Sequence, residues 1–87
     1  MEKSIEIKRK VARVIREERR RLEITQQSLA DAIGYSDAFI SDLEAAKSSL
    51  PAECIPLVVA KLRFKSVTDF WHKVQSIEVE FVDDGWD

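Results

Sequence analysis

The sequence of 87 residues contains one cysteine, Cys54, and one histidine, His72. A single cysteine cannot form an intramolecular disulfide, and these two residues alone cannot complete a zinc site. No apolar run approaches the roughly 20 residues that a membrane-spanning helix requires. Basic residues interrupt the N-terminal segment, which therefore does not resemble a signal peptide. These absences argue against a disulfide scaffold, a metal centre and a membrane protein, and we expect a cytoplasmic protein without a cofactor.

Glycine and proline are also scarce, with two of each. Few positions can therefore adopt the backbone angles of tight turns, and helices are the expected secondary structure. Hydrophobic residues make up 45% and charged residues 34% of the chain, which is typical of a folded domain. A chain of this length has room for one core. We expect an all-α fold, a compact bundle of four to five helices.

The charges are distributed unevenly around a formal net charge of −2. The segment 77–87 carries five acidic residues and no basic one, which leaves residues 1–76 with 14 basic and 11 acidic residues. Most of the basic excess lies in residues 1–24. We therefore predict a basic domain over residues 1–76 and an acidic C-terminal tail over residues 77–87.

Apolar spacing predicts a long first helix over about residues 4–21 and two helices in the last third of the chain. Pro51 and Pro56 lie near the start of the fourth helix, which should end at about Phe64. The fifth helix should cover about residues 67–75, with Ser66 as its N-cap. The first helix carries an apolar stripe of Val11, Ile15 and Leu22 with Val14 beside it, and the fifth helix should bury Phe70, Trp71 and Val74. The fourth helix coincides with a strongly apolar run, formed by Ile55, Leu57, Val58, Val59, Ala60 and Leu62.

Between these helices, residues 25–45 predict two short helices joined by a tight turn. Thr25 and Ser36 are good N-cap residues, and Gly34 fits the left-handed position that ends the first of the two helices. Ile40 should hold the second short helix against the core. Such a pair is a helix-turn-helix, which can place its second helix in the major groove of DNA.

The stretch from Ile15 to Leu62 resembles the Cro/CI-type (XRE-like) helix-turn-helix domain of phage repressors and bacterial regulators. The resemblance covers just over half of the chain, and its spacing is uninterrupted. It implies a lambda repressor-like fold and sequence-specific binding of DNA. The residues that carry it are Ile15, Arg16, Arg19, Thr25, Gln26, Gln27, Ser28, Leu29, Ala30, Gly34, Ser36, Ile40, Ser41, Leu43, Glu44, Lys47, Pro51, Val59 and Ala60.

The resemblance also implies roles for individual residues. Arg19 and Glu44 would form an ion pair that ties the first helix to the third. Gln26 would contact a phosphate, and Lys47 would reach the DNA backbone just beyond the third helix. The full set of predicted DNA-binding residues is Gln26, Gln27, Tyr35, Ser36, Asp37, Ala38, Ser41, Asp42 and Lys47.

Two features depart from this family's pattern. Asp37 and Asp42 lie on the reading face, the side of the third helix formed by them with Ala38 and Ser41, and this helix carries no Lys or Arg. Carboxylates accept hydrogen bonds from cytosine N4, but phosphates repel them. Asp37 has an alternative role, because an acidic residue in a first turn suits the helix dipole. After the third helix, Ala45 and Ala46 stand where the family commonly has a glycine. The third helix is therefore expected to run longer there.

The tail has three interpretations. Residues 77–82 alternate apolar and acidic side chains, which is a strand pattern, and an isolated strand must pair, fold back or stay flexible. It could pair in a homodimer, fold onto a basic surface such as the chain's own first helix, or act only as a solubilising end. The predicted dimer-interface residues are Phe70, Trp71, Val74, Ile77, Val79 and Phe81.

Two functions are compatible with these features. The first is a repressor-like transcriptional regulator that binds a palindromic operator in double-stranded DNA as a homodimer. The alternative is a helix-turn-helix module used for protein–protein interaction, for example an antitoxin, with weak or no DNA binding. An enzyme is not expected, because the sequence offers no nucleophile–base pair, metal set or phosphate-binding glycine loop.

Overall fold

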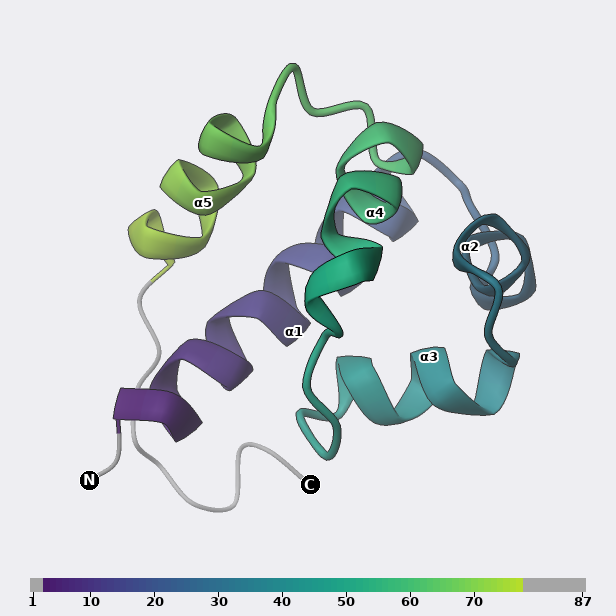
Figure 1. The fold of residues 1–87 in the computed structure, drawn as a ribbon, viewed down its shortest axis with the longest axis horizontal. Helices are drawn as coiled ribbons and strands as arrows, with labels where there is room; N and C mark the ends of the chain where they lie inside the picture. Colours follow the sequence, from purple (N-terminus) through teal and green to yellow (C-terminus); the bar gives the residue numbers. More distant parts are fainter. Residues whose placement is uncertain (1–2, 78–87) are drawn as a thin grey trace.

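The computed structural model describes residues 3–77, and this part of the chain folds into five α-helices and one short 3-10 helix (Figure 1). The all-α class and the number of helices are confirmed. The alternating segment predicted as a strand lies, apart from Ile77, outside the described residues. The elements are α1 Lys3–Arg21, α2 Gln26–Ile33, α3 Asp37–Glu44, η1 Ala52–Cys54, α4 Ile55–Lys61 and α5 Val67–Ser76.

Three helices begin at the residues that the sequence predicts as N-caps. The hydroxyls of Thr25, Ser36 and Ser66 each accept a hydrogen bond from the backbone N–H three residues further along, at 3.0, 3.2 and 3.1 Å. Each of these bonds satisfies one of the amide groups that a helix start leaves without a partner. Gly34 ends α2 with φ of 80°, the left-handed conformation expected of it.

The expected extension of α3 through Ala45 and Ala46 is wrong. The helix ends at Glu44, and Ala46 adopts the left-handed conformation with φ of 60°. The N–H of Lys47 donates to the carbonyl of Asp42 at 2.8 Å, which closes the helix end in the manner usually reserved for glycine. Alanine thus occupies a backbone conformation that costs about 1–2 kcal/mol for a residue with a Cβ.

The core lies where α1 packs against α3 and α5 while α2 packs against α3 and α4 (Figure 1). Phe70 of α5 and Ile15 of α1 are its largest fully buried side chains, whereas Trp71 is only half-buried. The α4 run buries one face alone, and Leu57 remains 47% exposed. The buried apolar residues are Val11, Ala12, Val14, Ile15, Leu29, Ala30, Ile33, Ile40, Leu43, Cys54, Val58, Val59, Leu62, Phe70 and Val74.

Cys54 and His72 have different surroundings. Cys54 is buried, and its Sγ lies 3.9 Å from the carbonyl oxygen of Ile33. His72 is exposed on α5. Among residues 3–77, no group of three potential metal ligands comes together. None of the helices in this part of the chain is both long enough and apolar enough to cross a bilayer.

Candidate nucleic-acid interface

The inner side of the α2–turn–α3 unit is completely buried. Leu29 and Ala30 of α2, and Ile40 and Leu43 of α3, have at most 1% of their surface exposed. This burial fixes α3 with one side against α1 and α2, so that its other side faces outward at the periphery of the fold (Figure 1). The packing therefore presents an exposed helix on a rigid support, as the sequence predicts.

Arg19 and Glu44 form a buried ion pair behind α3. Arg19 Nε donates to Glu44 Oε2 at 2.6 Å, and Arg19 Nη2 donates to Glu44 Oε1 at 3.0 Å. The third guanidinium nitrogen, Nη1, donates to the carbonyl of Ile24 at 2.8 Å. The two residues are 9% and 6% exposed, and each polar end has several partners. A satisfied bidentate pair of this kind fixes the end of α3 against α1.

The two glutamines predicted to contact DNA are engaged with neighbouring carboxylates. Gln26 Nε2 donates to Glu44 Oε1 at 3.2 Å, and Gln27 Nε2 donates to Asp31 Oδ1 at 2.8 Å. Gln26 is half-buried, so its side chain extends the buried network that includes the ion pair. Its carbonyl oxygen and second amide hydrogen form no hydrogen bond within the described residues. A phosphate contact from Gln26 remains a prediction.

Tyr35 occupies the turn and stacks on Phe39, with ring centroids 4.4 Å apart and planes at 26°. Its side chain is 38% exposed. Partial desolvation raises the pKa of the Tyr35 phenol, and the neighbouring Cys54 and Glu53 raise this pKa further. The phenol is therefore neutral at physiological pH, so its hydroxyl can donate as well as accept a hydrogen bond.

The structure brings the reading face together on the exposed side of α3. Asp37, Ala38, Ser41 and Asp42 are all exposed, and Lys47 is exposed just beyond the helix. Ser36 is also exposed, but its hydroxyl oxygen caps the helix. Contacts from these residues to bases or phosphates remain predictions.

The reading face is acidic. Asp37 and Asp42 form no ion pair within residues 3–77, and α3 itself contains no basic residue. Asp37 lies in the first turn, where the helix dipole favours a negative charge. Asp42 lies beyond this turn, so the dipole gives it no comparable stabilisation. The face therefore offers hydrogen-bond acceptors to a partner and repels phosphates.

Two residues of the predicted dimer interface need a correction, and the interface itself remains a prediction. Phe70 and Val74 are 0% and 2% exposed in the monomer, so their side chains present no surface to a second copy. Trp71 and Ile77 are half-buried. Val79 and Phe81 lie outside the described residues. Helical spacing identified the apolar residues of α5 but could not tell which of them the core would cover.

A family model for helix-turn-helix domains matches residues 15–53, from the middle of α1 to η1. This segment is similar to the helix-turn-helix domains of the XRE family. The family consists of DNA-binding regulatory domains and not of enzymes, which supports a DNA-binding regulator as the general class of this chain. No curated protein matches the chain. The α4 and α5 helices lie outside the matched segment.

Proposed function

We propose that the chain is a repressor-like transcriptional regulator that binds a palindromic operator as a homodimer and inserts α3 into the major groove. The observation that carries the proposal is the exposed reading face, supported from behind by the buried Arg19–Glu44 pair within the matched segment. A helix held in this way needs no rearrangement to enter the groove, which is about 12 Å wide.

The chemistry of the reading face limits which bases it can select. The Asp42 carboxylate can only accept, so it suits the N4 amino group of cytosine. Ser41 can donate or accept, and the methyl group of Ala38 suits the methyl group of thymine. No arginine is available on α3 for the bidentate contact to guanine. We expect an operator whose half-site requires cytosine at the position that faces Asp42.

Phosphate contacts must come from residues outside α3. Lys47 is exposed beyond α3, and the start of α2 presents backbone N–H groups close to Gln26. Because each neutralised phosphate steepens the dependence of affinity on salt, these few contacts predict a shallow salt dependence and weak non-specific binding. Specificity would then depend largely on the reading face.

The test is a selection from random double-stranded DNA by the purified chain at about 0.15 M salt. We expect a palindromic site to be enriched, and Asp42→Asn should relax the requirement for cytosine at one position of each half-site. Asp69→Asn is the control, because it removes the same charge at an exposed residue of α5, outside the reading face. It should leave the enriched site unchanged. An empty selection would contradict the proposal.

Dimerisation is tested separately, by sedimentation equilibrium of the chain with and without the selected DNA. A two-fold operator requires two copies of α3, so we expect a dimer at least on DNA. A monomer at high micromolar concentration that also binds DNA one copy at a time would remove the homodimer from the proposal. The interface must be formed by residues other than the buried Phe70 and Val74.

The acidic reading face also favours a second candidate, a helix-turn-helix that binds a basic protein partner. Asp37 and Asp42 are exposed without ion pairs in the described part of the chain, as a surface for a basic partner would require. Under this alternative, the DNA selection stays empty, and Asp42→Lys abolishes binding of an identified partner while Asp69→Lys does not.

A further inference from the structure

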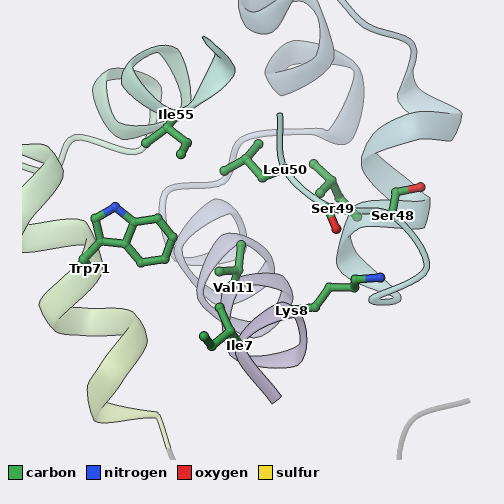
Figure 2. A pocket seen from close by; sticks show the side chains of 9 residues that line it. Ile7, Lys8, Val11, Ser48, Ser49, Leu50, Ile55 and Trp71 are labelled. Carbon is green, nitrogen blue, oxygen red and sulfur yellow. The ribbon is translucent and has the colours of Figure 1, made fainter. Parts of the chain in front are cut away.

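An apolar hollow of about 240 Å³ lies between the first half of α1, the segment after α3, the start of α4 and the middle of α5 (Figure 2). Its apolar wall is formed by Ile7, Val11, Leu50, Ile55 and Trp71. Ile7 is 49% exposed at its edge, and Trp71 is half-buried. A cavity of about 150 Å³ can hold a benzene ring, so this hollow has room for one aromatic side chain.

One side of the hollow is polar. Figure 2 shows Lys8, Ser48 and Ser49 together, on the opposite side from Trp71. Within residues 3–77, the ion pairs of α1 involve other cations and leave the Lys8 ammonium without a carboxylate partner. The hollow therefore suits an occupant that combines an aromatic or aliphatic group with a negative charge next to it.

The sequence directly after α5 has this composition. Residues 78–87 carry five carboxylates, no basic side chain, and the aromatic residues Phe81 and Trp86. Ile77 leaves α5 in an extended conformation, with φ of −73° and ψ of 130°, and packs against the core. Ten extended residues reach about 33 Å, which exceeds the 31 Å longest dimension of the fold. The segment is thus long enough to reach the hollow.

We propose that residues 78–87 dock in the hollow of their own chain, with an aromatic side chain against Trp71 and a carboxylate on Lys8. Covalent attachment at Ile77 favours this intramolecular contact over the same contact between two molecules, because the tethered segment has a high effective concentration. The contact would place negative charge beside Ser48 and Ser49, close to Lys47. If the proposed DNA binding is correct, docking would weaken phosphate contacts, but the docking itself does not depend on that function.

The experiment places a nitroxide spin label on the full-length chain through Asp84→Cys and measures the loss of NMR signal intensity that it causes. Cys54 is 2% exposed and should not react, and the parent chain treated in the same way controls for this. We expect the amide signals of Ile7 and Val11 and the indole signal of Trp71 to lose intensity. In a second sample, the isotope-labelled chain carries no nitroxide and is mixed with a nitroxide-labelled chain that gives no NMR signal. No loss of intensity is expected in this sample, because the contact is within one molecule.

Two matched variants of the labelled chain sharpen this test. Ile7→Glu adds a repelling charge to the edge of the hollow, whereas Ile5→Glu makes the same change on α1 at a residue that is 46% exposed and does not line the hollow. Ile7→Glu should restore the signals of Val11 and Trp71, and Ile5→Glu should not. The proposal is overturned if the spin-labelled Asp84→Cys chain shows undiminished signals. It is also overturned if Ile7→Glu and Ile5→Glu affect the signals equally, or if the loss of intensity appears only between different molecules. The last result would indicate a second copy as the occupant.

Discussion

The two faces of α1 differ in how closely the neighbouring elements pack against them. Toward α3, both carboxylate oxygens of Glu44 accept hydrogen bonds from Arg19, and Ile40 and Leu43 are at most 1% exposed. Toward α5, Ile7 and Trp71 border an apolar hollow that this part of the chain leaves open. The first face lies in the segment that matches the XRE family, whereas α5 lies outside that segment. The packing toward α3 therefore lies within the segment that resembles other helix-turn-helix domains, and the packing toward α5 does not.

Removing one member of the Arg19–Glu44 pair should weaken the packing of α1 against α3 more than any of the other proposed substitutions. Glu44→Ala leaves the Arg19 guanidinium buried without a carboxylate, and we expect a loss of about 3–5 kcal/mol in the free energy of unfolding. Glu17→Ala is the control, because the Arg13–Glu17 pair is about half exposed and should contribute at most about 1 kcal/mol. Urea denaturation measures both. Similar small losses in the two variants would mean that the buried pair does not hold α3.

The turn between α2 and α3 should be the next most sensitive feature. Gly34→Ala places a side chain at φ of 80°, and a Cβ there would meet no atom within 4 Å. The expected loss of about 1–2 kcal/mol is therefore due to the backbone conformation alone. Thermal unfolding monitored by circular dichroism measures it. An unchanged midpoint would show that this backbone conformation is not required.

The other end of α3 should respond in the opposite direction. Ala46→Gly relieves a left-handed alanine with φ of 60° and should stabilise the chain by about 1 kcal/mol. Ala45→Gly is the matched control, because Ala45 has φ of −92° and gains nothing from the substitution. If both variants lower the midpoint of urea denaturation, then Ala46 is not strained.

Local signals explain how much of the first face could be predicted from the sequence. Thr25, Gly34 and Ser36 have local roles in capping or turning, so their types alone located both ends of α2 and the start of α3. The Arg19–Glu44 pair joins residues 25 positions apart and was expected only through the family resemblance. The engagement of Gln26 with Glu44 was missed, because it depends on how α2 packs beside that pair.

Features that depend on the tertiary arrangement could not be predicted. Alanine is a good helix former, so the residue type of Ala46 does not indicate a left-handed conformation. The signal at this place was the family's customary glycine, which the alanine pair replaces. Phe70 and Trp71 are adjacent apolar residues, and only packing decides that the core covers the first and half-exposes the second. The hollow itself requires α1, α5 and the segment after α3 to be in place together.

The most direct test of the proposed recognition is an NMR titration of the chain with its selected DNA duplex. If α3 enters the major groove, the amide signals of Ala38, Ser41 and Asp42 should shift strongly, while those of Ile7 and Val11 on the other face should shift little. Shifts confined to α1 and α5, with the signals of α3 unchanged at saturation, would contradict recognition of DNA by α3.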